Sequence, residues 1–214
     1  MPAPIPSDIR SRDADRSQQT ILDAALAEFS SHGLAGARMD RIAERADVNK
    51  RLIYYYFKSK DALFLAVLED AYARIRQAEQ ALRLHDMPPA QAIRRLTEFT
   101  WDYYIAHPEF LTLLNSENLH EGRHVVHSAR IGEMNSPLIE TLGEILERGR
   151  REQLFRGGID AMQLYVSIAG MAYFYLSNHY TLSAVFGRNL MTPKAHQERL
   201  SHMCDVVLGY VLKD

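Results

Sequence analysis

Apolar residues recur three and four positions apart in successive segments of the chain, which is the spacing of one face of an α-helix. An amphipathic segment, QQTILDAALAEFSSHG, comes first, and two short segments follow between Met39 and Lys60. Ala43 and Ala46 are small enough to let a second helix cross closely, and Asp47 occupies the turn between the two segments. The pattern predicts a helix-turn-helix in this region.

Beyond Ser59 the same spacing predicts a series of further helices. Proline, glycine or capping residues mark most of their ends. The segment from His120 to Asn135 has the weakest pattern. The expected helices cover residues 59–84, 88–107, 108–119, 136–154 and 160–185, and a last one opens at Thr192 and Pro193.

The whole chain is therefore expected to fold as an all-α protein. Residues 1–14 contain three prolines and predict a flexible arm, which either reaches a DNA groove through its arginines or is a plain disordered terminus. Residues 15–60 are expected to form a three-helix, helix-turn-helix DNA-binding domain. Residues 61–214 are expected to form a helical ligand-binding and dimerisation domain.

The polar face of the helix-turn-helix carries the residue types that contact nucleic acid. Basic and amide side chains donate hydrogen bonds to base edges and phosphates, and aromatic rings offer flat apolar surface. The candidate DNA-binding residues are Arg38, Asn49, Lys50, Arg51, Tyr54, Tyr55, Tyr56 and Lys60.

These segments, taken in order, resemble the DNA-binding domain of the TetR family of transcriptional regulators. The likeness covers roughly residues 16–65 and includes IAERADV, the third helix ending at Phe57, and SKDAL opening a fourth helix. Asp47 stands where members of the family usually have glycine, and aspartate tolerates a left-handed turn conformation better than most residues. Ala37 and Arg38 stand where a capping Thr or Ser is usual, so a phosphate contact there is expected from Arg38 or from backbone amides.

Residues 160–185 are apolar or aromatic almost all round, and such a helix must be covered on every side. The last helix carries a second apolar stripe. The resemblance implies that these two helices from each of two chains form a four-helix interface, and a homodimer suits a palindromic operator. The alternative is that both are core helices of a single chain.

Charge and cysteine content agree with an intracellular DNA-binding protein. The formal net charge is -2, but residues 1–60 carry 10 Lys and Arg against 8 Asp and Glu, so the positive surplus lies with the helix-turn-helix. The single cysteine, Cys204, excludes an intrachain disulfide framework and falls on an apolar helical face. No secretion signal or membrane-length apolar run is present, and a cytoplasmic location is expected.

The ligand-binding residues are expected where polar groups lie among aromatic ones in the middle helices, because a buried amide needs a partner and a ligand is one such partner. A satisfied internal hydrogen bond is the alternative for each of them. The candidates are Trp101, Tyr104, Asn115, Asn118, Phe174 and Asn178.

His120, His124 and His127 would share one face if their segment were helical, and three imidazoles can hold zinc. A metal-responsive regulator is therefore an alternative hypothesis, although Gly122 weakens the helical pattern. A helical enzyme is a remote alternative, because the chain lacks a Gly-x-Ser-x-Gly elbow, a phosphate-binding glycine loop and a His-Glu-x-x-His sequence. No cofactor is expected.

These features predict a one-component transcriptional regulator. It would bind a palindromic DNA operator as a homodimer and act as a repressor that a small organic inducer, such as an aromatic or heterocyclic acid, releases. The C-terminal half, with HPEFLTLLNSEN and NHYTLSAVFGRNL, is similar to the branch of the TetR family that contains the pyrimidine-utilisation repressor.

Overall fold

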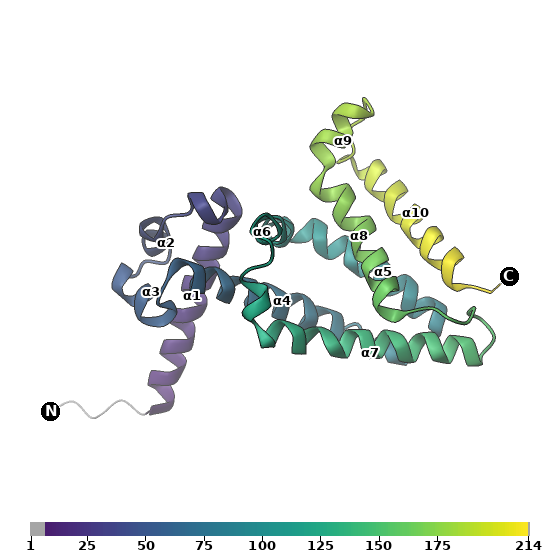
Figure 1. The fold of residues 1–214 in the computed structure, drawn as a ribbon, viewed down its shortest axis with the longest axis horizontal. Coiled ribbons are helices and arrows are strands. Elements are labelled where there is room, and N and C mark those ends of the chain that lie inside the picture. The colour runs from purple at the N-terminus through teal and green to yellow at the C-terminus, as the bar shows by residue number, and fades with distance from the viewer. Residues whose placement is uncertain (1–6, 214) are drawn as a thin grey trace. The chain divides into compact units, whose positions relative to one another are not determined.

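The computed structural model describes residues 7–213, and in that range every named element is a helix, as the sequence predicts. Two short 3₁₀ helices, η1 (Leu84–Asp86) and η2 (Val125–His127), accompany the α-helices. Among the described residues, no helix is both long and apolar enough to cross a membrane. The α-helices are α1 (Ser7–Gly36), α2 (Met39–Arg45), α3 (Lys50–Phe57), α4 (Lys60–Gln80), α5 (Pro89–Ala106), α6 (Pro108–Leu119), α7 (Ala129–Arg151), α8 (Ala161–Ser177), α9 (His179–Val185) and α10 (Pro193–Val211) (Figure 1).

The described chain forms two compact units that do not follow the order of the sequence. Unit 1 contains residues 7–72 and 112–129, and unit 2 contains residues 73–111 and 130–213. Helices α4 and α6 each contribute several residues to both units, and α7 contributes its first residue to unit 1 and the rest to unit 2. The backbone therefore passes between the units three times in the described range, each time within a helix.

In unit 1, α1 packs against α2, and α2 packs against α3 (Figure 1). Ile21, Ile42 and Ile53 are fully buried, one from each of these helices. The rings of Phe29 and Phe64 meet edge to face with centroids 5.1 Å apart, which joins α1 to α4. The apolar stripes predicted from the sequence thus meet in one small core.

The turn between α2 and α3 also forms as predicted. Asp47 has a φ of 52°, the left-handed conformation that aspartate adopts more readily than most residues. The N–H of Val48 donates to the carbonyl oxygen of Ala43 at 3.0 Å and closes the end of α2. A glycine is not needed at this position.

Several helix ends in unit 2 are set by the residues that the sequence singles out. Pro89 is the first residue of α5, where its missing N–H leaves no hydrogen bond unmade. The side chain of Thr192 accepts a hydrogen bond from the N–H of Ala195 at 3.2 Å and caps α10. These two predictions are confirmed.

Three predicted boundaries are wrong. Helix α1 begins at Ser7, so residues 7–14 are helical backbone, because all three prolines of the predicted arm lie before Ser7; residues 1–6 are outside the described range. Helix α7 begins at Ala129 and runs through Pro137 instead of starting there. The expected helix over residues 160–185 breaks at Asn178, whose side-chain amide donates to the carbonyl oxygen of Phe174 at 2.9 Å.

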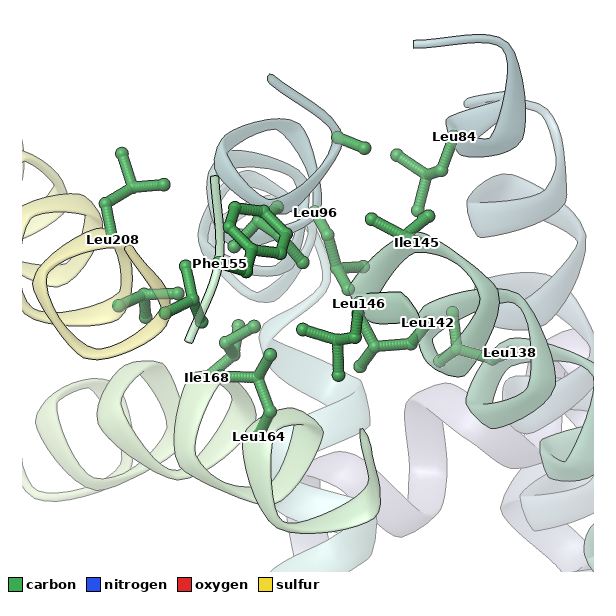
Figure 2. Close-up of a cluster of buried hydrophobic side chains, with 14 residues drawn as sticks. Leu84, Leu96, Leu138, Leu142, Ile145, Leu146, Phe155, Leu164, Ile168 and Leu208 are labelled. Carbon is green, nitrogen blue, oxygen red and sulfur yellow. The ribbon is translucent and has the colours of Figure 1, made fainter. Parts of the chain in front are cut away.

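Unit 2 is built around α5, which packs against both α8 and α10. Figure 2 shows leucine and isoleucine side chains from α5, α7, α8 and α10 converging around Phe155, which is 2% exposed. Phe155 and Leu212 form an isolated antiparallel bridge that ties the end of α10 to the turn after α7. Cys204 is buried with a free thiol, as predicted.

Helix α7 approaches Phe155 at Gly149. A Cβ atom placed on Gly149 would overlap three carbon atoms of the Phe155 ring. The absence of a side chain at this position is therefore what lets the ring enter the core.

We expect Gly149→Ala to lower the free energy of unfolding by about 1 to 3 kcal/mol, because the added methyl forces the Phe155 ring out of place. Gly143→Ala is the matched control, since Gly143 lies in the same helix and a Cβ there meets nothing within 4 Å. The control should be neutral or stabilised, by up to about 1 kcal/mol from helix propensity. Chemical denaturation measures both, and equal stability of the two variants would contradict the predicted overlap.

Candidate functional site

Helix α3 presents the predicted DNA-facing side chains. Asn49 caps it, and its side-chain oxygen accepts a hydrogen bond from the N–H of Arg51 at 2.8 Å. Ile53 faces the core, whereas Arg51, Tyr54 and Tyr55 are exposed, with Tyr55 at 68%. An exposed basic and aromatic face on a short helix is suited to contacts in a DNA major groove.

The remaining basic side chains surround this face, and each has a defined partner. The ammonium of Lys50 lies 2.8 Å from an exposed carboxylate oxygen of Asp40. The ammonium of Lys58 donates to the carbonyl oxygen of Tyr55 at 2.6 Å and lies 5.3 Å from the centre of its ring. Tyr56 is half-buried, with its ring 5.3 Å from that of Tyr55. The group lies on α3 or directly after it.

Lys60 and Arg38 lie where α1 ends and α2 begins. The Lys60 ammonium donates to the carbonyl oxygens of Ala35 and Ala37, at 3.5 and 3.3 Å, where α1 ends and α2 begins. Arg38 is exposed and occupies the N-cap position of α2 without a side-chain capping bond, as the sequence predicts. Both cations remain near the N-terminus of α2, where anions bind favourably.

Glu28 on α1 supplies a hydrogen-bond acceptor at the start of α2, where Arg38 makes no side-chain capping bond. Glu28 was not identified from the sequence. Its carboxylate, 1% exposed, accepts hydrogen bonds from the N–H of Arg38 at 2.9 Å and from Nε of Arg41 at 2.7 Å. Burial acts to raise the pKa of Glu28, but the bond from Arg41, the bond from the Arg38 backbone and the Arg41 charge together lower it. Glu28 thus fixes the start of α2 against α1.

The candidate ligand-binding residues occupy different surroundings. Trp101 is buried, with its ring edge-on to those of Tyr175 and His196, both at 5.6 Å. Tyr104 is also buried, with its ring centre 5.9 Å from that of Phe110. Trp101 and Tyr104 are therefore both part of the buried interior of unit 2.

The other four candidates are less enclosed. Asn115 and Asn118 belong to unit 1, and the Asn118 amide donates to its own helix at the Leu114 carbonyl oxygen, 2.8 Å away. Phe174 is 59% exposed, and Asn178 ends α8. A pocket shared by the six residues stays a prediction.

A cavity of about 220 Å³ in unit 2 offers a different candidate site. Arg76 and Glu79, which line it from α4, are 5% and 4% exposed, and the Arg76 Nη1 atom lies 2.9 Å from Glu79 Oε2. Sequence reasoning missed both residues. The available signal is that Leu68, Ile75 and Glu79 follow a helical spacing of seven and four, which puts Glu79 in line with apolar core positions.

The three histidines do not form a metal site. His124 is buried, and its Nδ1 and Nε2 atoms lie 2.6 Å from Glu117 Oε2 and 3.2 Å from Asp61 Oδ1. His120 instead pairs its Nδ1 with the carbonyl oxygen of Ser116, and His127 is exposed. Within residues 7–213, no group of three or more potential ligand side chains has metal-binding geometry. The metal-responsive alternative has no support, because a 3₁₀ helix and turns separate the imidazoles.

Glu117 has a structural task in that cluster. It accepts hydrogen bonds from the N–H groups of His124 and Val125, at 2.7 and 2.9 Å. Burial acts to raise the pKa of Glu117, but the bonds from Val125 and His124 outweigh it and lower that pKa. The cluster closes the turn after α6 onto the first turn of α4, within unit 1.

Comparison with known proteins identifies these units. Residues 21–67 match the family model described as bacterial regulatory proteins, tetR family, and residues 89–207 match the model of the tetracyclin repressor-like C-terminal domain. The chain belongs to the TetR family. The resemblance drawn from the helix-turn-helix sequence is confirmed, and the second match extends it over residues 89–207, which include most of unit 2.

Curated relatives within the TetR family agree. The HTH-type transcriptional repressor NicS of Pseudomonas putida is 42% identical over 200 residues, which is 94% of each chain. The HTH-type transcriptional regulator RutR of Escherichia coli is 36% identical over 110 residues, about half of each chain (51%).

Solved structures of other regulators share the fold at low identity. The regulator SCO4942 of Streptomyces coelicolor matches with a TM-score of 0.67 at 23% identity, over 91% of this chain and 98% of that one. The fatty acid degradation regulator FadR of Bacillus halodurans matches with a TM-score of 0.70 at 16% identity, over 90% and 95%.

We expect Glu28→Gln to destabilise the DNA-binding unit by about 2 kcal/mol at neutral pH, because the charged, buried acceptor of two part-buried hydrogen bonds is lost. Since the folded state lowers the pKa of Glu28, its stabilising effect is full above the unfolded value near 4.5 and is lost as the pH falls through the folded value. Denaturation curves of the wild type and the variant should therefore converge in acid.

The exposed Glu44→Gln on α2 is the matched control and should leave stability unchanged. If Glu28→Gln and Glu44→Gln were equally stable at neutral pH, the anchoring role of Glu28 would be wrong.

Proposed function

We propose that the protein is a homodimeric cytoplasmic repressor that binds a palindromic operator through α3 and leaves it when a small organic molecule enters unit 2. The observation that carries this proposal is the exposed basic and aromatic face of α3 within a chain that belongs to the TetR family. The name of NicS, a relative over 94% of this chain, favours repression over activation.

Base recognition is assigned to Arg51 and Tyr55, which project from the exposed side of α3. Arginine reads guanine through two parallel hydrogen bonds, and an aromatic ring can pack on a thymine methyl group. Phosphate contacts are assigned to Lys60 and Arg38, which lie near the N-terminus of α2. These contacts position the protein without reading sequence.

Dimerisation is assigned to the exposed apolar side of α8 and α10. The apolar face consists of Met162, Val166, Phe174, Val206 and Tyr210, which are between 44% and 59% exposed. A groove between the two helices is lined by Val166, Gly170 and Val206. A contiguous apolar surface of this kind marks an interaction site, and a second copy of the chain would pair α8 and α10 into a four-helix bundle.

The link between ligand and operator is assigned to the helices that contribute to both units. Helix α4 carries Asp61 of the Glu117–His124 cluster in unit 1 and Arg76 and Glu79 of the cavity in unit 2. A ligand shifts the balance between two dimer geometries only if it binds one of them better. We assign the released state to the geometry in which the two α3 helices no longer match the half-site spacing.

For DNA recognition, we expect Tyr55→Ala and Arg51→Ala to change the preferred bases, whereas Lys60→Ala should weaken binding to all operator variants alike and reduce the salt slope by about one. Titration of a panel of operator variants at two salt concentrations measures these effects. Lys194→Ala, an exposed cation on α10, is the control and should bind as the wild type does. Unchanged base preference in both α3 variants would contradict the assigned reading face.

For assembly, we expect Val206→Glu to convert the dimer into monomers and to lower operator affinity, because it places a charge in the apolar face. Sedimentation velocity measures the assembly, and an operator titration measures the binding. Val126→Glu is the control: Val126 is 76% exposed, lies in unit 1 and is outside the apolar face. A Val206→Glu variant that remained dimeric would remove α10 from the interface.

A further inference from the structure

The Arg76–Glu79 pair is buried in unit 2 with much of its hydrogen-bonding capacity unused. Neither Glu79 carboxylate oxygen has a hydrogen bond, and the Nε and Nη1 atoms of Arg76 have none either. The satisfied group is Nη2 of Arg76, which donates to the Tyr165 hydroxyl at 2.6 Å. The contact between Arg76 and Glu79 is thus an ion pair without hydrogen-bond geometry.

Such an arrangement is costly for a purely structural pair. Buried polar groups are nearly always hydrogen-bonded, and an unmet one costs about 1 to 3 kcal/mol, more when it is charged. Replacing a buried pair by apolar residues is often neutral or stabilising, so stability alone gives little reason to keep it. The unused donors and acceptors point to a partner that is not part of the chain.

The adjoining cavity has the size and lining of a small binding site. Its volume of about 220 Å³ equals the liquid volume of about seven water molecules, so it admits one substituted ring. Leu84, Met134, Pro137 and Leu138 provide apolar lining in addition to the polar pair. The side chains of Gln80 and His85 also line it and are exposed, which places them at the solvent side.

We infer that this cavity is the inducer site and that the inducer is a neutral, single-ring compound with a carbonyl oxygen beside a ring N–H. The carbonyl oxygen accepts from the free Arg76 donors, and the ring N–H donates to the Glu79 carboxylate. The ring lies against the apolar walls. This inference rests on the proposed function and adds the location and the chemical class of the ligand.

Charge balance favours the neutral compound over the aromatic or heterocyclic acid expected from the sequence. Arg76 and Glu79 together carry no net charge when both are ionised, and a neutral ligand keeps that balance. An acid would leave one uncompensated negative charge among buried atoms unless Glu79 took up a proton. Burial raises the pKa of Glu79 to about 7, against the opposing effect of Arg76, so proton uptake is a second route that the experiment must separate.

The test compares 2-pyridone with N-methyl-2-pyridone, because methylation removes the ring N–H and keeps the carbonyl oxygen. Calorimetry on the full chain should show 2-pyridone binding at least about tenfold more tightly, the effect of one hydrogen bond to a charged group. Only 2-pyridone should raise the melting temperature and weaken operator binding at matched concentration. Absent binding of 2-pyridone, or equal affinity for both probes, overturns the inference.

A third probe, pyrrole-2-carboxylate, tests the charge argument. It presents an N–H beside a carboxylate in place of the neutral carbonyl group. Weaker binding than that of 2-pyridone supports a neutral ligand, and tighter binding overturns that assignment of chemical class.

Two variants locate the binding. In Glu79→Met the difference between 2-pyridone and its N-methyl form should disappear, because the acceptor is gone. Thr141→Leu adds bulk to the cavity lining from α7, leaves both residues of the ion pair in the sequence, and should abolish binding of both probes. The matched control is Glu98→Gln, which alters a partly exposed Arg–Glu pair of the same i,i+3 spacing on α5 and should leave probe binding unchanged.

Persistence of the probe difference in Glu79→Met, or of binding in a folded Thr141→Leu, places the ligand elsewhere. Operator binding by the unliganded wild type is measured separately. Failure there overturns the proposed function, whereas failure of the probes alone overturns only this inference.

Discussion

The DNA-binding surface depends on α3, a helix of eight residues. An isolated helix of this length is not stable in water. Helix α3 is kept in place by its Asn49 cap, by the fully buried side chain of Ile53, and by chain reversals on both sides of it. Asp47 and Lys58 both have positive φ, at 52° and 64°, so the backbone turns sharply before and after the helix. The exposed side chains inherit their direction from these contacts.

The same dependence extends to α2, which has seven residues and no capping hydroxyl. Glu28 replaces that cap from a neighbouring helix, and its carboxylate also holds the Arg41 guanidinium. A carboxylate near a helix N-terminus is stabilised by the free N–H groups there. Unit 1 is therefore organised by a few polar contacts around an apolar core of modest size.

Much of this architecture follows from the sequence because the responsible interactions are local. Helix spacing, the Pro89 and Thr192 helix starts and the Asp47 turn depend on neighbours within a few residues. Less local features were predicted wrongly. Pro137 looks like a helix start, yet the preceding residues continue as α7, since a proline loses only one backbone hydrogen bond when neighbouring packing holds the helix.

Polar partners across the fold were the least predictable. A charged residue on a helix is usually solvated, and nothing local distinguishes Glu28 or Arg76 from an exposed residue. Their roles depend on which helices meet, and in unit 2 that includes residues as far apart in sequence as Arg76 and Tyr165. The six ligand candidates follow from the placement of polar residues among aromatic ones in the sequence. The cavity in unit 2 is distinguished instead by polar atoms without hydrogen bonds.

Unmet hydrogen bonds in a regulator have a use that they lack in a rigid scaffold. Buried donors and acceptors without hydrogen bonds destabilise the conformation that buries them. A ligand that forms those hydrogen bonds lowers the free energy of that conformation alone. A coupling of about 1 to 3 kcal/mol corresponds to a change of about 5- to 150-fold in affinity at a linked site. Two or three hydrogen bonds to Arg76 and Glu79 are on that scale. These residues lie on α4, which directly follows α3 and contributes to both units, so in the mechanism that we propose the ligand's binding energy acts on that helix.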